Sequence, residues 1–510
     1  MESSRKRKSL KNIIFALFSN VFIYCLSLFT SKIIKEKLGL EILGLNGVLS
    51  NVISILSVSE MGIGSAITFA LYKPLVNNDE EAIKSLMQFY KKAYRIIAFI
   101  VFVIGGCLLH FVPYFAGETT LSNKYIYLVY SLFLINSIIS YLLVYKRTLI
   151  VADQKNYIIS TITLISTYIL KLGQLLIVFF TSSYVLYLLI QIFVTLCYNI
   201  TISFICNKLY PYLQTNAQKL PKEIFTMVLQ KIKAMFFHTI GSVVVTGTDN
   251  ILISFFCGIE IAGKYTSYYS VIIILTNILY MIFDNIRDSV GNFLVTETTD
   301  DKYRLFKRLY FVNQSIVTIF SICTVFLITP FITVWLGSDV VLDNSVVLAI
   351  VISFYLNKNN IFISDMRSAA GLFEKDKYVP VIESIVNLVA SILLAKQFGL
   401  IGIILGTIIS TIIGPFWVKP LIVYKYIFDN KLKSFFLLYL TYFIRAIGLY
   451  FITYYFVNKI CIFPITSMIL FFIKAFILFM FVSTIWFISF CYKDEEKYFI
   501  SLLLSKIRKS

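Results

Sequence analysis

Long apolar runs recur along the whole of this 510-residue chain. A helix needs about 20 apolar residues to cross the hydrocarbon core of a bilayer, and the chain contains about fourteen such runs. Hydrophobic residues make up 58% of the sequence and charged residues 14%, which is far more apolar than soluble proteins are. The sequence therefore predicts an all-α, polytopic membrane protein with about 14 transmembrane helices.

The runs give the expected positions of these helices. They cover residues 12–34, 42–72, 94–115, 125–145, 158–180, 184–206, 236–257, 265–293, 309–330, 345–364, 379–396, 400–424, 435–457 and 465–491. No small-residue cleavage site follows the first run, so we expect it to be a retained span.

Basic residues alternate between the two ends of these runs. Most of the 46 lysines and arginines fall in every second connection. The other connections hold mainly Lys35, Lys37, Lys124, Lys264, Lys396 and Lys459. Because cytoplasmic loops carry the positive residues, we expect both termini in the cytoplasm. The net charge of +19 then indicates contact with anionic membrane lipids, not with nucleic acid.

The chain carries an internal repeat. Segment 258–275, GIEIAGKYTSYYSVIIIL, follows the pattern of segment 39–56, GLEILGLNGVLSNVISIL. The aligned pairs include Gly39 with Gly258, Glu41 with Glu260 and Gly44 with Gly263; a second echo aligns Arg147 with Arg367 and Tyr157 with Tyr378. An even number of spans per repeat keeps both halves in one orientation, so we predict a parallel repeat.

The repeat divides the chain. We predict two six-helix bundles, residues 1–206 and 236–424, joined by a cytoplasmic linker, 207–235. Residues 425–510 would add two transmembrane helices and a cytoplasmic tail. In segment 78–94, Asn78 and Glu81 have the spacing of a capping box, which predicts an amphipathic helix on the inner surface.

Enzymatic chemistry has little support. Gly258 to Lys264 fits a phosphate-loop pattern, but Tyr265 stands where Ser or Thr is needed. The chain has two histidines and no long outer loop to hold a catalytic site. Its eight cysteines are scattered without a CxxC pair, so we expect neither a metal site nor disulfides, and no cofactor.

The eighth span is polar along one face. At 100° per residue, one arc of the helix collects Thr266, Tyr269, Ser270, Asn277, Tyr280, Asp284, Arg287, Asp288 and Gly291. This stripe either packs against neighbouring helices or lines a water-filled cavity. In the second reading, Asp284 and Arg287 are spaced to pair while the cavity is empty.

Other ionisable residues also interrupt apolar runs. Glu60, in the second span, would cost about 3 kcal/mol if it were unpaired, so it predicts an ion site, a proton site or an interhelical contact. Further charges within predicted spans are Lys171, Asp249, Lys358, Glu383, Arg445 and Lys474. We take Asp249, Lys171 and Lys358 as cavity candidates, and the two lysines as candidate ligands of an anionic headgroup.

Several segments resemble one family of transporters. They are EMGIGSAITFALYKPLVNNDEEAIKSLMQFYKKAYR from Glu60, YKRTLIVADQKNY from Tyr145, TDNILIS from Thr248 and RSAAGLFEKDKYVPVIESIVNL from Arg367. These strings are similar to those of the polysaccharide transport family of flippases. That family belongs to the multidrug, oligosaccharidyl-lipid and polysaccharide exporter superfamily.

The resemblance implies a function. Two bundles would enclose a central cavity, and alternating access would carry oligosaccharide repeat units on undecaprenyl diphosphate across the bacterial cytoplasmic membrane. We expect Arg147 and Arg367 at the cytoplasmic mouth. Candidate partners are the lipid-linked substrate, a coupling ion (proton or sodium) and a polysaccharide polymerase.

Two alternatives stay open. In a cation- or proton-coupled multidrug antiporter, buried carboxylates such as Glu60 and Asp284 would bind the cation. Fourteen spans and the loop strings favour the polysaccharide branch instead. A membrane glycosyltransferase or polymerase would need a large outer loop, which this sequence lacks.

Overall fold

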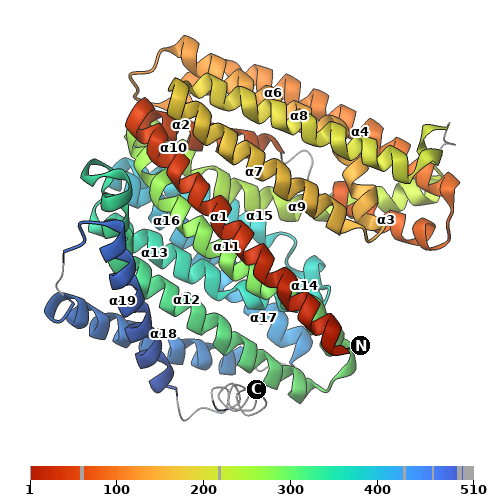
Figure 1. Cartoon of the computed structure of the whole chain (residues 1–510). Helices are drawn as coiled ribbons and strands as arrows, with labels where there is room; N and C mark the ends of the chain where they lie inside the picture. The colour runs from red at the N-terminus through yellow and green to blue at the C-terminus, as the bar shows by residue number, and fades with distance from the viewer. Residues whose placement is uncertain are drawn as a thin grey trace. The chain divides into compact units, whose positions relative to one another are not determined.

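The structure, a computed structural model, describes residues 2–57, 63–215, 220–428, 432–461, 464–490 and 497. All regular elements in these ranges are helices, which confirms the predicted all-α class (Figure 1). Eleven of the described helical segments are long and apolar enough to cross a membrane. Shorter apolar helices cover 40–56, 66–76 and 243–257. The count of 14 remains a prediction.

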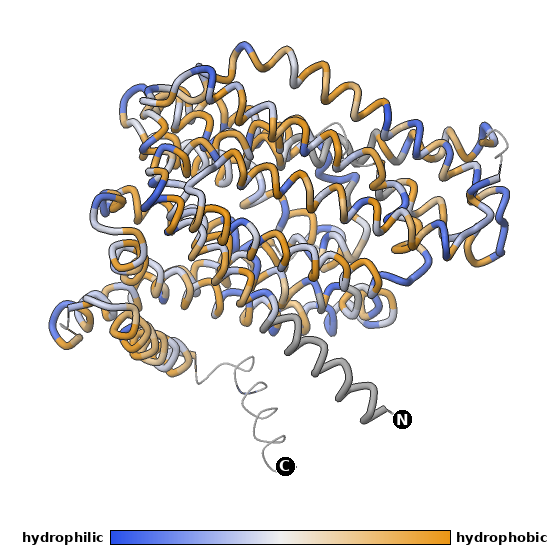
Figure 2. The backbone as a smooth tube through the Cα atoms, turned by 45° about the horizontal axis from the view of Figure 1, so that its top comes forward, coloured by the Kyte–Doolittle hydropathy of each residue, from blue (hydrophilic) through white to orange (hydrophobic). Residues whose placement is uncertain are grey.

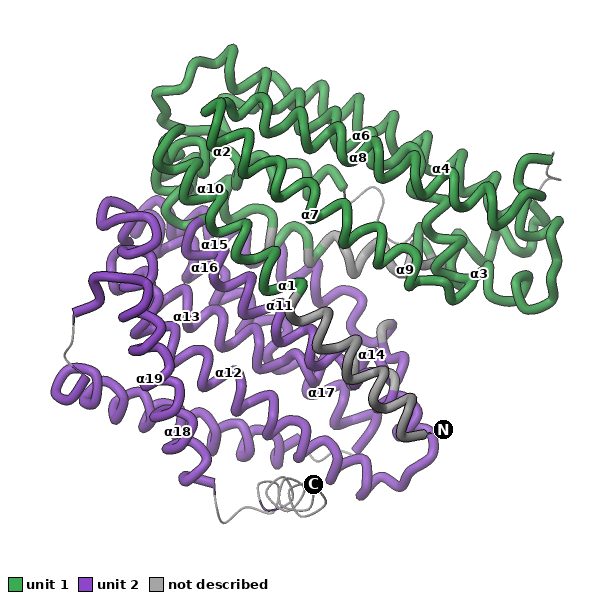
Figure 3. The backbone as a smooth tube through the Cα atoms, viewed as in Figure 1, with its two compact units in different colours: residues 1–266 green, residues 267–510 purple. Residues whose placement is uncertain are grey.

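The chain forms two compact units, residues 1–266 and 267–510, and the division falls inside one helix (Figure 3). The helices that begin in the first unit are α1 (Glu2–Leu38), α2 (Leu40–Leu56), α3 (Ile63–Val76), α4 (Glu80–Leu108), η2 (Leu109–Phe111), α5 (Val112–Ala116), α6 (Asn123–Ala152), α7 (Asn156–Thr181), α8 (Tyr184–Leu209), η3 (Pro211–Gln214), α9 (Lys222–Gly247), α10 (Asp249–Cys257) and α11 (Ile259–Thr296). Since α9 already begins at Lys222, the connection after α8 is shorter than the predicted linker 207–235.

The second unit contains most of α11 and all later elements. These are α12 (Thr299–Leu336), η4 (Ser338–Val340), α13 (Asn344–Asn359), α14 (Ile361–Ala369), η5 (Leu372–Asp376), α15 (Val379–Phe398), α16 (Leu400–Ile413), α17 (Pro415–Ile427), α18 (Leu432–Lys459) and α19 (Met468–Ile488). Within this unit α15 packs along α16, and α12 contacts α13, α18 and α19.

The helix surfaces fit a bilayer. Figure 2 shows the long helices apolar over most of their length, with hydrophilic residues mainly near their ends and in the connecting turns. On α19 the exposed side chains Ile469, Phe472, Ile473, Phe476 and Met480 recur at helical spacing. A continuous exposed apolar face of this kind is stable only against lipid or another apolar surface.

One aligned pair of the predicted repeat has matching backbone geometry. Gly39 and Gly258, aligned in the sequence, have nearly the same conformation, φ 89° and ψ 169° against φ 88° and ψ 159°. Positive φ favours glycine, and each residue directly precedes a helix, α2 or α11. The next aligned glycines meet within the first unit, where a Cβ on Gly44 would lie 3.0 Å from the Gly263 nitrogen. The repeated pattern therefore specifies both a boundary between two consecutive helices, at Gly39 and Gly258, and a close helix crossing, at Gly44 and Gly263.

The amphipathic segment 78–94 differs from its prediction. The cap is Asp79, whose side chain accepts a hydrogen bond from the Ala82 nitrogen at 3.0 Å, while Asn78 has φ 53°. α4 then continues unbroken into the third span. Its predicted apolar face (Ile83, Leu86, Met87, Tyr90 and Tyr94) is buried inside the first unit. The prediction of a separate helix on the membrane surface is therefore wrong, because this face packs against other helices of the protein, chiefly α3 and α6.

Candidate functional site

The polar face of α11 meets α14 in the second unit. Tyr280, Asp284 and Arg287 follow one another at spacings of four and three residues, so they share one side of α11. Arg287 donates to the Asp365 carboxylate of α14 from Nε at 2.9 Å and from Nη2 at 2.5 Å. Nη2 also donates to Asp284, the pair that the sequence predicts. Arg287 is therefore held by carboxylates from two helices.

Exposure differs sharply within this cluster. The Asp365 side chain is 9% exposed, whereas those of Arg287 and Asp284 are 40% and 52% exposed. Asp365 is thus the buried partner of the guanidinium, while the Arg287 side chain as a whole stays partly exposed. Such an arrangement lets an incoming anion compete for a cation that is already oriented.

A break between α13 and α14 positions Asp365. The helix is interrupted at Asn360, and Asn313 of α12 donates its amide to the carbonyls of Asn359 at 3.0 Å and Lys358 at 3.3 Å. These bonds hold the end of α13 at the interruption. Asp365 lies in the helix that follows it, α14.

Lys358 lies at the end of α13, close to the same region. Its Nζ is 5.4 Å from the centre of the Tyr280 ring, within range of a cation–π contact. Lys419 of α17 interacts electrostatically with both Lys358 and Asp365. Lys358 therefore lies beside Tyr280 in the second unit. The role of these residues in a cavity stays a prediction.

Arg367 has a buried partner. It forms an ion pair with Asp376 of η5, and the two side chains are 10% and 1% exposed. A buried pair of this kind destabilises a protein strongly when one partner is removed. Arg367, the predicted residue of the cytoplasmic mouth, therefore ties α14 to η5 in this structure.

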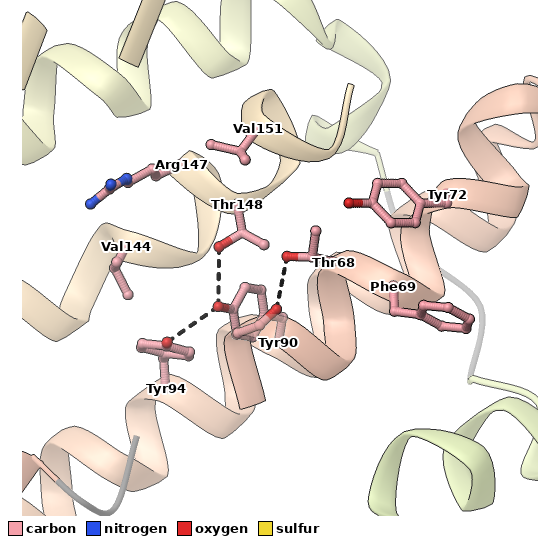
Figure 4. Close-up of a pocket in the computed structure, with 10 residues that line it drawn as sticks. Thr68, Phe69, Tyr72, Tyr90, Tyr94, Val144, Arg147, Thr148 and Val151 are labelled. Carbon is pink, nitrogen blue, oxygen red and sulfur yellow. Dashed lines mark hydrogen bonds between the residues drawn. The ribbon is translucent and has the colours of Figure 1, made fainter. Parts of the chain in front are cut away.

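Arg147 lines a cavity of about 550 Å³ in the first unit, between α3, α4 and α6. Figure 4 shows the Tyr90 hydroxyl between those of Tyr94 and Thr148, at 3.2 and 3.1 Å. Thr68 and Tyr72 add further hydroxyl groups to the lining. The cavity thus combines one accessible cation with several hydroxyls and aromatic rings, a surface suited to anionic and sugar groups.

The remaining predicted site residues are dispersed. Lys171 is half-buried in α7, and Asp249 is the half-buried first residue of α10, both in the first unit. Asn277 is half-buried on α11. Glu60 lies outside the described residues, and Asp288 lies in α11 with its side chain outside them.

Sequence reasoning missed Asp365 and the hydroxyl group of Tyr90. Asp365 follows an apolar run and stands two residues before Arg367, and that carboxylate near the end of a span is the only local signal. Tyr90 lies on the predicted apolar face of its helix. Nothing in its spacing indicates that its hydroxyl bonds to Thr148, 58 residues away.

The fold is similar to those of several solved membrane transporters. The chain matches the lipid II flippase MurJ with a TM-score of 0.63 and 15% identity, over 94% of this chain and 100% of that one. It matches a multidrug resistance MATE family transporter of the MOP superfamily with a TM-score of 0.60 and 12% identity, over 78% and 94% of the two chains. A MATE transporter of Vibrio cholerae, VcmN, gives a TM-score of 0.59 and 14% identity, over 83% and 98%.

Neither a protein-family model nor a curated protein sequence matches the chain. The structural matches show the fold of MOP superfamily transporters, which is the fold that the sequence resemblance implies. This protein is therefore an integral membrane protein with a transporter fold.

Proposed function

We propose that this protein is a flippase for oligosaccharide repeat units linked to undecaprenyl diphosphate, acting in capsular, exo- or O-antigen polysaccharide synthesis. It would work by alternating access in a bacterial cytoplasmic membrane, with both termini in the cytoplasm. The observation that carries the choice of substrate is Arg287, a 40% exposed cation that carboxylates hold in place. A diphosphate can replace carboxylates at a planar guanidinium because it offers several anionic oxygens with matching geometry.

The extent of the structural matches favours a lipid flippase over a multidrug transporter. Residues before α18 make up less than nine-tenths of the chain, so a match over 94% must reach into α18, α19 or the tail. The matches to MATE transporters cover 78% and 83% of the chain, and residues before α18 are enough to account for them. The two C-terminal helices therefore support the flippase branch.

The polar lining suits the rest of the substrate. Sugar hydroxyls bind to hydroxyl and amide groups and stack on aromatic rings. Tyr280 stands beside Arg287 on α11, and the cavity with Arg147 presents Thr68, Tyr72 and Thr148. The substrate's polyprenyl tail would remain against the apolar outer surface of the helices.

A cation- or proton-coupled antiporter is the second candidate, and Asp365 favours it. This carboxylate is 9% exposed and could bind a proton or a cation when Arg287 moves away. The two candidates differ in what they require of Arg287. A flippase needs its positive charge for the substrate, whereas a cation antiporter needs the carboxylate and should tolerate loss of the arginine.

A deletion strain tests the proposed function. In a host without a second flippase of this type, deletion should abolish surface polysaccharide and leave lipid-linked repeat units on the inner leaflet, since the upstream enzymes still act. Reintroduced wild-type protein should restore the polymer. Normal surface polysaccharide in the deletion strain would refute the proposal. Unchanged polysaccharide together with lost resistance to cationic drugs would identify the antiporter.

A further inference from the structure

A second polar pocket lies at one end of the first unit, apart from the cavity with Arg147. It has a volume of about 350 Å³. Its lining residues are Lys84, Met87, Gln88, Lys91, Tyr145, Lys146, Asn207, Leu213, Gln214 and Thr215. Three lysines from α4 and α6 therefore face one small space, and none of these described lining residues is acidic.

The local hydrogen bonds fix two of the lysines. Lys146 donates to Ser203 Oγ at 2.6 Å and to Asn207 Oδ1 at 2.8 Å. Both acceptors are neutral, so they orient the ammonium group without cancelling its charge. Lys84 is 9% exposed and donates to Thr215 Oγ1 at 3.2 Å, and it also pairs with Glu81.

All charged side chains in the described lining of the pocket are lysines. Glu81 is 52% exposed and offsets part of the Lys84 charge from outside the lining. Lys91 is exposed and lies close enough to Lys146 for mutual repulsion. Bringing like charges together costs free energy, which a bound anion would recover.

The location indicates which side of the membrane the pocket faces. α4 begins at Glu80, whereas α6 ends at Ala152 and α8 ends at Leu209, so the pocket lies where the start of α4 meets the ends of α6 and α8. The distribution of basic residues predicts that this end is cytoplasmic. Basic pockets between helices on that side are suited to lipid phosphates.

We propose that Lys84, Lys91 and Lys146 form a binding site for the phosphate of an anionic ligand at the cytoplasmic end of the first unit. A volume of about 350 Å³ accommodates a headgroup but not an oligosaccharide. The phosphate can come from a lipid of the inner leaflet or from a free phosphate compound. This site does not depend on what the protein transports.

Thermal unfolding of the purified full-length protein in detergent tests this site. Phosphatidylglycerol should raise the unfolding temperature, and zwitterionic phosphatidylcholine should not. Lys91→Glu places a carboxylate at the pocket, so about tenfold more phosphatidylglycerol should be needed for the same shift. Lys92→Glu is the matched control, because this neighbour is exposed and outside the lining.

A second variant and a second ligand complete the experiment. Lys146→Gln removes another lining charge and should weaken the response in the same direction. If sodium phosphate at millimolar concentration reproduces the stabilisation, the ligand is a free phosphate; if only the lipid acts, it is a headgroup. Equal responses of wild type and Lys91→Glu, or equal effects of the two lipids, would overturn the site.

Discussion

Arg287 of α11 and Asp365 of α14 are joined by two hydrogen bonds, from Nε at 2.9 Å and from Nη2 at 2.5 Å, although 78 residues separate them. The Arg287 side chain is partly exposed and the Asp365 side chain is nearly buried. An anion that binds Arg287 would therefore loosen a contact between two helices of the second unit. This link between binding and helix packing is what an alternating-access transporter requires.

Substitution of Arg287 tests its role as a substrate ligand. Arg287→Ala removes the charge and should reduce transport about tenfold to a hundredfold. This fold-change corresponds to the free energy of one or more charge-assisted hydrogen bonds. Arg287→Lys keeps the charge but loses the planar fork, so it should retain partial transport. Surface polysaccharide and membrane abundance are measured together.

Arg304→Ala is the matched control for that experiment. Arg304 also pairs with an aspartate three residues earlier, Asp301, but it is 64% exposed on α12. Its loss should leave transport unchanged. Full transport by Arg287→Ala at normal abundance would show that Arg287 is not a substrate ligand.

Asp365→Asn should strengthen substrate binding, whereas Arg287→Ala should weaken it. The substitution keeps the side-chain shape and removes the carboxylate that competes with the substrate for Arg287. We expect a short-chain polyprenyl diphosphate to bind the purified variant about tenfold more tightly, with slower transport because the empty state is less well held. Weaker binding than in wild type would contradict this competition. Asp301→Asn serves as the control on α12.

The sequence predicted the contact between Asp284 and Arg287 within one helix, but not the contact between Arg287 and Asp365 of another helix. Helical periodicity predicts that Asp284 and Arg287 can pair, and they do. The run 345–364 contains a polar stretch, Asn357 to Asn360, at the interruption, but the amide that stabilises the interruption comes from Asn313 in another helix. The contact of Asp365 with Arg287 joins two helices that are far apart in the sequence, so it could not be derived from local pattern.

The buried pair Arg367–Asp376 gives a prediction about stability. Arg367→Ala and Asp376→Ala should each lower the free energy of unfolding by about 3–5 kcal/mol, because each removes the ion-pair partner of a buried charge. The double variant should be less destabilised than the sum of the single ones. Unfolding temperatures in detergent are measured for the wild type, the two single variants and the double variant. Additive losses of stability would show that the two side chains do not interact.

The contact between repeated glycines gives a prediction about packing. A Cβ on Gly44 would overlap the Ile259 carbonyl and approach the Gly263 nitrogen, so Gly44→Ala should destabilise the fold by about 1–3 kcal/mol. Gly106→Ala is the control, because a Cβ there meets no described atom within 4 Å. That variant should be neutral or slightly stabilising, since alanine favours the helix. Equal unfolding temperatures for the two variants would refute a close crossing at Gly44.

The predicted orientation can be tested with single cysteines in a background without native cysteines. Glu118 and Lys377 are both exposed, and Glu118 follows the end of α5 whereas Lys377 follows η5. Because basic residues concentrate in the segments 146–156 and 367–377, we expect these segments to be cytoplasmic. A membrane-impermeant maleimide applied to intact cells should label Glu118→Cys, and should label Lys377→Cys only after the membrane is permeabilised.

Asn156→Cys, also exposed, provides a second cytoplasmic position that should behave like Lys377→Cys. Labelling of either cytoplasmic position in intact cells, with Glu118→Cys protected, would reverse the topology and place the three-lysine pocket on the outer side.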